Sequence, residues 1–374
     1  MFNLFKGEIR KIVKKRTILG FSITFVAVLV LVAILFNFMM KLIEDVTSSD
    51  EFSDMMEEME GMEGMEGIDM GDIEFLQNEF YTTGYLSEKE LREMIVVVKE
   101  RYAKIEKAYS ENKKANYADF YEVKSELAVL EYALENGYYD KPVYILGMNC
   151  EALSGISEKG SAESFVGLYS AIIAIIVLIY GIVMGAGLYT NEYKSGTIKL
   201  LMVRPITKNR LTSAKLLSML SLLTVMYLVP TFIGFIYSAI VYGTDASVPV
   251  LYSFNGAFAS EGTIGGMSFG TVFAQWVQIL VLATVSFSVG TITKKTNAGI
   301  IVAMVIMLGI ADMLSGLGIN AFLLSTSLDF MAYFGVNSSV PTYGNFFIAL
   351  AVSVIWTATL VVALYLVTNK RDVV

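Results

Sequence analysis

Residues 165–188 read FVGLYSAIIAIIVLIYGIVMGAGL, a run of 24 residues with no charged side chain and no proline. A helix needs about 20 predominantly apolar residues to cross the hydrocarbon core of a bilayer. The run therefore predicts a membrane-spanning helix, and further apolar runs along the chain bring the predicted number of spans to six. The other five runs cover residues 18–40, 216–241, 271–292, 298–319 and 346–367.

The composition of the whole chain agrees with this pattern. Hydrophobic residues make up 55% of the sequence, charged residues only 17%, and the mean hydropathy is +0.58. These values are too apolar for an ordinary soluble domain. We predict an all-α polytopic membrane protein with six transmembrane helices, an N-terminal amphipathic interface helix and a large extracytoplasmic helical-hairpin insertion between the first and second spans.

The composition argues against several classes of function. The chain has no histidine and a single cysteine, Cys150, which argues against the usual zinc, haem and Cys/His nucleophile sites and leaves no intrachain disulfide. We therefore expect no catalytic residue, no metal and no cofactor in this chain. The formal net charge of -8 argues against nucleic acid as a partner.

The distribution of basic residues predicts the orientation in the membrane. Of the 28 Lys and Arg residues, 16 lie before the first span, between the second and third, between the fourth and fifth, and after the last. The loops at 242–270 and 320–345 contain none. By the positive-inside rule, both termini lie in the cytoplasm of a multi-pass cell-membrane protein. The segment 41–164, with 29 of the 36 acidic residues, is then extracytoplasmic.

The first 16 residues predict a cytoplasmic amphipathic helix. Phe5 and Ile9 lie on its apolar stripe, Arg10 lies on its basic side, and such a helix lies along the lipid bilayer surface. The following span, 17–40, is preceded by basic residues as a secretory signal would be. Its apolar stretch is too long for one and no small-residue cleavage site follows, so we interpret it as an uncleaved membrane anchor.

The extracytoplasmic segment 41–164 divides into two parts. Residues 44–74 form an acidic linker rich in Met and Gly, with a repeated Met-Glu-Gly unit at 62–67 that is either a solvated tether or a thioether site for Cu(I). Residues 87–137 contain two stretches with apolar residues three and four apart, which predict a helical hairpin. Whether the hairpin also binds a substrate or a partner is left open.

Polar residues inside the apolar runs are the candidates for an intramembrane site. Asp312 is the only acidic residue well within a predicted span, and Gln275 and Gln278 lie within the fourth. Ionisable side chains in membrane segments are functional candidates. A hydrogen-bonded structural role, holding helices together, is the alternative for all three residues.

The segment 190–215 follows the second span and carries a distinctive order of residues. It contains, in this order, an acidic residue, a Gly-Thr pair, a Leu-Leu pair, an Arg-Pro pair and an Ala-Lys pair. These are Glu192, Gly196, Thr197, Leu200, Leu201, Arg204, Pro205, Ala214 and Lys215, with Thr207 and Lys208 between them. Glycine allows a tight turn, the leucine pair offers an apolar docking surface, and the Arg-Pro pair ends a helix.

This segment resembles the loop between the second and third membrane helices of ABC-2 type ABC transporter permeases. One departure is Lys208, where arginine is common, which puts a two-pronged contact at that position in doubt. The interface helix, the six spans and the large insertion after the first span also resemble that family. Residues 190–215 correspond to that loop. The resemblance implies that its first part, residues 192–204, is the coupling helix that contacts the ATPase.

The resemblance implies the permease subunit of an ATP-driven exporter. It implies a second permease subunit, identical or related, and separate ATPase subunits that hold ATP and Mg. The chain itself has no Gly-x-x-x-x-Gly-Lys-Ser/Thr run and so no ATPase site of this type. Two alternatives remain: a membrane-anchored signalling or partner-binding protein acting through the hairpin, and a gradient-driven secondary transporter. The exported substrate is left open.

Overall fold

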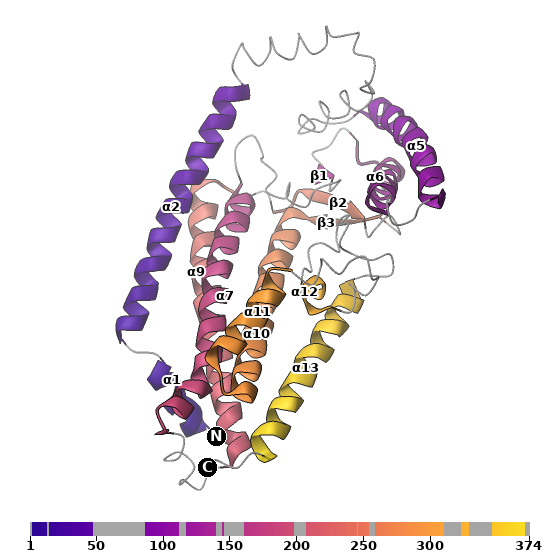
Figure 1. The fold of residues 1–374 in the computed structure, drawn as a ribbon. Helices are drawn as coiled ribbons and strands as arrows, with labels where there is room; N and C mark the ends of the chain where they lie inside the picture. Colours follow the sequence, from indigo (N-terminus) through magenta and orange to yellow (C-terminus); the bar gives the residue numbers. More distant parts are fainter. Residues whose placement is uncertain are drawn as a thin grey trace.

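A computed structural model describes eleven segments of the chain (Figure 1). Most of the described residues are helical, and one small sheet accompanies the helices. The described segments are residues 2–12, 15–47, 87–111, 117–139, 144–145, 161–197, 207–244, 246–253, 259–309, 323–328 and 346–370.

Among the described residues, five helices are long and apolar enough to cross a membrane, and they run alongside one another in Figure 1. Each contains one of the predicted apolar runs, namely the first, second, third, fourth and sixth. The helices are α2 (Lys15–Thr47), α7 (Ala162–Lys194), α9 (Lys208–Val241), α10 (Ile264–Thr293) and α13 (Phe346–Lys370). A multi-pass helical membrane protein is confirmed.

The predicted fifth span at 298–319 is not covered by one long helix among the described residues. Helix α11 (Thr296–Met307) occupies its first part and has 12 residues, too few to cross a bilayer. Residues 310–322 lie outside the described part of the chain, and Asp312 is among them. The count of six spans therefore stays a prediction.

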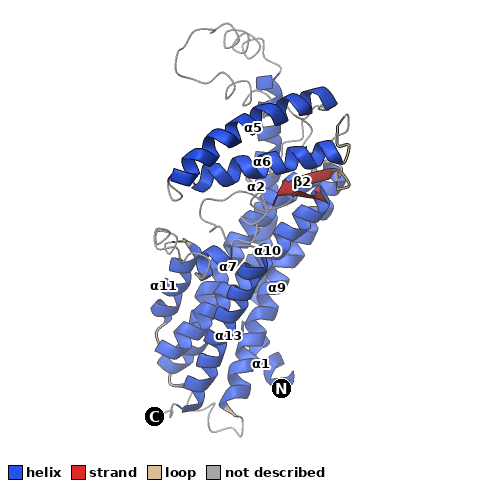
Figure 2. Cartoon of the chain, turned by 90° about the vertical axis from the view of Figure 1, so that its right-hand side faces the viewer, coloured by secondary structure: helices blue, strands red, loops and turns tan. Residues whose placement is uncertain are grey.

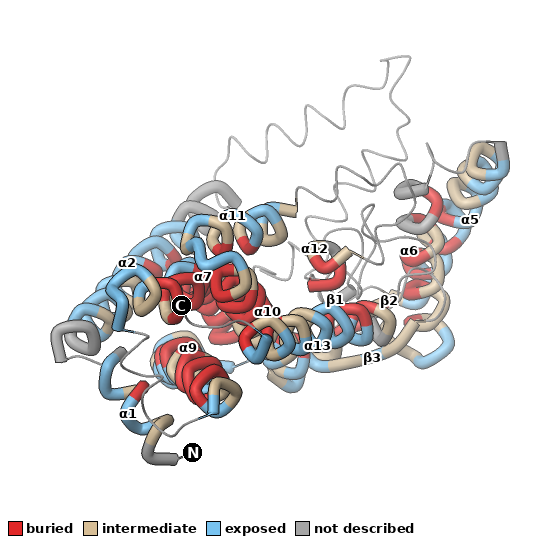
Figure 3. The backbone as a smooth tube through the Cα atoms, turned by 60° about the horizontal axis from the view of Figure 1, so that its bottom comes forward, coloured by how far each residue is buried: buried red, intermediate tan, exposed pale blue. Residues whose placement is uncertain are grey.

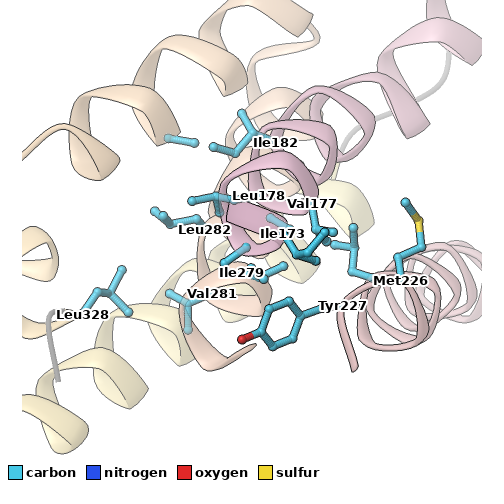
Figure 4. Close-up of a cluster of buried hydrophobic side chains, with 14 of the residues drawn as sticks. Ile173, Val177, Leu178, Ile182, Met226, Tyr227, Ile279, Val281, Leu282 and Leu328 are labelled. Carbon is cyan, nitrogen blue, oxygen red and sulfur yellow. The ribbon is translucent and has the colours of Figure 1, made fainter. Parts of the chain in front are cut away.

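The core lies between α7, α9 and α10. Ile173, Val177 and Ile182 of α7 are fully buried, as is Tyr227 of α9, and Figure 4 shows these side chains packed around the α7 helix. Figure 3 shows the contrast with α2, which is exposed along most of its length. In a bilayer the exposed apolar side chains of α2 face lipid or another helix, and α7 is central to the bundle.

Small residues allow α7, α10 and α11 to approach closely. A Cβ atom at Gly299 of α11 would lie 2.5 Å from the carbonyl oxygen of Ser286 in α10. A Cβ atom at Gly185 of α7 would lie 2.8 Å from the carbonyl oxygen of Ala283, and one at Gly290 would lie 3.0 Å from that of Ala186. Glycine is required at these crossings because any side chain would push the backbones apart.

Two helices and a sheet lie beyond one end of the bundle (Figures 1 and 2). Helices α5 (Glu88–Glu111) and α6 (Tyr117–Glu135) pack together within the region predicted as a hairpin. The sheet has the order β1-β2-β3, with β1 (Tyr144–Ile145) parallel and β3 (Ala259–Thr263) antiparallel to β2 (Pro249–Ser253). The sequence did not predict this sheet.

The helix pair and the sheet share one apolar core. Leu91 and Val98 of α5 and Val123 and Leu130 of α6 are buried with Leu251 of β2, which is fully enclosed. Strands β2 and β3 come from the connection between α9 and α10, far along the chain from the helix pair. The insertion after the first span is thus packed against a second, shorter insertion, and does not stand alone.

The sheet is joined to α10 without a linker. Thr263 is the last residue of β3 and the N-cap of α10, where its hydroxyl oxygen accepts a hydrogen bond from the Gly266 amide at 3.1 Å. At the other end of the bundle, α1 (Phe2–Ile12) packs against α9 (Figure 1). Near the opposite end of α13, the Ser353 hydroxyl donates to the Ser327 carbonyl of the short helix α12 (Leu324–Ser327) at 3.2 Å.

Candidate functional site

A lysine is buried where α1, α7 and α9 meet. The side chain of Lys215, two turns into α9, is only 1% exposed. Its ammonium nitrogen lies 2.7 Å from Glu192 Oε1 of α7 and 3.3 Å from Glu8 Oε2 of α1. It also donates to the Leu188 carbonyl at 3.5 Å and lies 5.5 Å from the centre of the Tyr189 ring. One cation thus joins three segments that are far apart in sequence.

A second cation completes the group. Lys11 Nζ lies 2.7 Å from Glu8 Oε1 and 3.7 Å from Glu192 Oε1, and its side chain is 54% exposed. We call Glu8, Lys11, Glu192 and Lys215 the Lys215 cluster. It has two carboxylates and two ammonium groups, so its net charge is zero.

Every charge of the cluster has an opposite charge beside it. Burial raises the pKa of Glu8, but the ammonium groups of Lys215 and Lys11 outweigh burial and lower that pKa below its ordinary value of 4.5. Glu8 is therefore ionised at neutral pH. Removing one partner from a buried ion pair typically costs about 3–5 kcal/mol, because it leaves an uncompensated charge. The cluster therefore favours one arrangement of the three helices.

The opposite side of α7 is held by the first residue of α11 and by the turn that precedes it. The Thr190 hydroxyl donates to the Ala186 carbonyl at 2.6 Å, so it accepts from the Thr296 hydroxyl, which lies 2.7 Å away. Lys194 also reaches Thr296 at 3.2 Å, and Lys294 lies 5.0 Å from the centre of the Tyr193 ring. The end of α7 is therefore fixed on both sides.

The predicted coupling segment begins at this fixed end. The backbone of Gly196 has φ +69°, a left-handed conformation that favours glycine, and the Ser195 and Thr197 hydroxyl groups lie 2.9 Å apart. Glu192, Gly196 and Thr197 are described, and Glu192 lies in the Lys215 cluster. The predictions for the remaining residues of the segment, Leu200, Leu201, Arg204 and Pro205, fall outside the described residues.

The interface-helix residues are arranged as an amphipathic helix requires. Phe5 and Ile9 are half-buried on α1 and Arg10 is exposed. Glu8 lies between them in sequence and turns towards α9 and α7.

The two described intramembrane candidates, Gln275 and Gln278, are separate from the Lys215 cluster. Gln275 of α10 accepts a hydrogen bond from the Tyr227 hydroxyl of α9 at 2.7 Å, and the neighbouring Trp276 donates to Thr224 at 3.1 Å. These contacts join two helices, which is the structural role considered as the alternative for Gln275. Gln278 is half-buried one turn further along α10. Asp312 lies outside the described residues, so a site shared by the three candidates stays a prediction.

Sequence reasoning missed Glu8 and the position of Lys215. A usable pattern was present, because Glu8 and Glu192 are the only acidic residues in the segments assigned to the cytoplasm, apart from Asp372. Glu8 also lies within the apolar arc of an otherwise basic helix. An acidic residue in such a position indicates a buried cationic partner.

The fold and the cluster define a class: a polytopic helical membrane protein whose interface helix is ion-paired to its second and third predicted spans. Comparison with known families identifies one family over nearly the whole chain. The model of a family described as "ABC-2 family transporter protein" matches residues 2–373. The chain belongs to this family of membrane transport components, which favours the transporter hypothesis over a membrane-anchored signalling protein.

Two relatives are from Bacillus subtilis (strain 168). The chain is 26% identical over 135 residues to "Uncharacterized protein YhcI", a match that covers 35% of this chain and 42% of that protein. It is 18% identical over 185 residues to "Uncharacterized membrane protein YdbK", which covers 48% of this chain and 71% of that protein. The match thus spans less than half the length of the first relative.

Proposed function

We propose that this chain is the permease subunit of an ATP-driven exporter. Separate ATPase subunits bind ATP and Mg and dock on the cytoplasmic segment that follows α7. A second permease, identical or related, completes the translocation path, since closed assemblies of like subunits are the common architecture of such complexes. Both termini, with α1 and the Lys215 cluster, lie on the cytoplasmic side, and α5, α6 and the sheet lie outside.

The Lys215 cluster is the observation that supports coupling to an ATPase. Ser195 follows the last residue of α7, within one turn of Glu192. A push on the docking segment therefore acts directly on Glu192. Because Glu192 and Glu8 are both paired with Lys215, a displacement of Glu192 is also transmitted to α9 and α1. Force reaches α9 through a buried ion pair and the core through α7.

The burial of α7 supports the same proposal. The helix packs against α2, α9, α10 and α11, so a shift along its axis must rearrange the whole bundle. Packed interfaces respond to small displacements by changing between discrete arrangements. A rearrangement of this kind is what alternating exposure of a substrate path requires.

The test is ATP hydrolysis by the complex of this chain with the ATPase that co-purifies with it. Glu192→Ala removes a carboxylate from the cluster, and Gly196→Val places a β-branched residue at a positive φ. We expect both variants to insert normally and to lose substrate-stimulated hydrolysis. Lys295→Met is the matched control, because Lys295 is an exposed cation of the α10–α11 turn with no ion pair among the described residues.

Two outcomes would contradict the proposal. Normal stimulation in both Glu192→Ala and Gly196→Val would show that the segment after α7 only connects two helices at the membrane surface. Transport by the purified chain in liposomes, without any ATPase and driven by an ion gradient, would favour a secondary transporter. Export is distinguished from import by the side on which substrate accumulates in inverted vesicles supplied with ATP.

A further inference from the structure

The outer face of α1 carries two cations. Lys6 and Arg10 are both exposed and four residues apart, so they lie on the same face of the helix. At 3.6 residues per turn each lies about 160° around the axis from Glu8. The face that carries Lys6 and Arg10 thus points away from the Lys215 cluster.

Within the described segments, these two cations differ from Lys11 in having no carboxylate partner. Lys11 is paired with Glu8 and Glu192, whereas no acidic side chain of the described segments forms an ion pair with Lys6 or Arg10. Like charges four residues apart on a helix repel each other. The pair is therefore complementary to an anion supplied from outside the chain.

The neighbouring face of α1 indicates where that anion comes from. Phe5 and Ile9 are half-buried beside the basic face, and α1 comes shortly before α2, whose apolar window begins at Gly20. A short basic amphipathic helix next to a membrane span lies at the bilayer surface, with its apolar side chains at the acyl boundary and its cations among the headgroups. Guanidinium and ammonium groups both bind phosphate oxygens there.

We propose that Lys6 and Arg10 bind the phosphates of anionic lipids in the cytoplasmic leaflet, and that this binding holds α1 where Glu8 reaches Lys215. Lipid charge then regulates how tightly Glu192 and α7 are held. The regulatory half rests on the proposed ATPase coupling, but the lipid site itself does not. In a neutral bilayer α1 keeps its apolar contacts and the ion pairs of Glu8 and Lys11 but loses the lipid contacts, and it leaves α9 more often.

The binding test uses the purified full-length chain in nanodiscs of phosphatidylcholine, with and without phosphatidylglycerol. A fluorescent label that senses its environment is placed at Gly7→Cys in a Cys150→Ser background. Gly7 is exposed, and a Cβ atom there would meet nothing within 4 Å. Each basic residue near an anionic surface raises affinity about fivefold, so two residues together give about 30-fold. We expect a phosphatidylglycerol-dependent emission shift that fades as salt is added.

The decisive comparison is between two double variants with the same change of charge. Lys6→Gln with Arg10→Gln should abolish the shift, and Lys104→Gln with Lys107→Gln, which alters exposed cations of α5, should leave it intact. A shift that is unchanged in the α1 variant, or missing in the parent protein, would overturn the lipid site.

The regulatory half has its own measurement. Stimulated ATP hydrolysis by the complex should rise with phosphatidylglycerol in the parent protein and not in the α1 double variant. Hydrolysis that is stimulated equally in both lipids would overturn regulation while the emission shift still supports the lipid site. Failure of Glu192→Ala to uncouple hydrolysis would overturn the proposed function, and the emission shift would still decide the lipid site.

Discussion

Replacing Lys215 with methionine tests the Lys215 cluster most directly. The substitution keeps a flexible side chain of similar length but removes the ammonium group from a position that is 1% exposed. Glu8 and Glu192 would then share one remaining cation, Lys11, which is half-exposed and lies 3.7 Å from Glu192. The two carboxylates, which Lys215 now bridges, would repel each other.

The expected cost follows from this geometry. Breaking a buried ion pair costs about 3–5 kcal/mol, and the low end applies here because Lys11 still neutralises one carboxylate. A loss of about 3 kcal/mol weakens the docking of α1 on α9 about 150-fold. Glu8 leaves first, because α1 is a short helix and α7 is held by the bundle core.

A spin label at Gly7→Cys, in the Cys150→Ser background, reports the docking of α1. In the parent protein the label should show one slowly moving population, and Lys215→Met should add a mobile one. Lys295→Met removes an exposed cation from the same side of the bundle and should leave the spectrum unchanged. If Lys215→Met also leaves the spectrum unchanged, the ion pairs do not hold α1 and the reasoning from burial is wrong.

Three further predictions concern other parts of the molecule. Gly299→Ala should lower the apparent melting temperature in detergent by the equivalent of about 2 kcal/mol, because the new Cβ would collide with a carbonyl oxygen of α10. Gly167→Ala is the control and should have little effect, because a Cβ atom there would meet nothing within 4 Å. Leu251→Asp should place a charge in the core shared by α5, α6 and the sheet, and limited proteolysis should then cut the α5–α6 region faster. Unchanged cleavage would show that the helix pair does not depend on the sheet. Because Glu8 has a pKa below its ordinary value of 4.5, its contribution to docking is fully present above pH 4.5 and is lost as the pH falls through the folded-state pKa. The spin label at position 7 should become mobile in that range, and Glu8→Gln should remove the pH dependence.

The sequence by itself determined that the chain is a multi-pass helical membrane protein. Apolar runs of 20 residues or more have one stable form in a bilayer, since a helix satisfies every backbone hydrogen bond within the segment. Helix α7 begins three residues before its predicted run and ends six residues after it, and α9 begins eight residues before its run, because polar residues continue these helices outside the apolar core. The order of residues from Glu192 to Lys215 also sufficed to suggest the family, because local motifs depend on neighbours in sequence.

Only the tertiary structure decided which distant residues meet. Lys215 and Glu8 are separated by 207 positions, and their pairing depends on how α1 lies against α9, which no periodicity reveals. The same holds for Gln275, which is bonded to Tyr227 of another helix, and for Leu251, whose five-residue strand becomes buried only because α6 packs over it. Hydrophobic patterns specify that a surface is buried, but the identity of the surface that covers it is set by the packing of the whole chain.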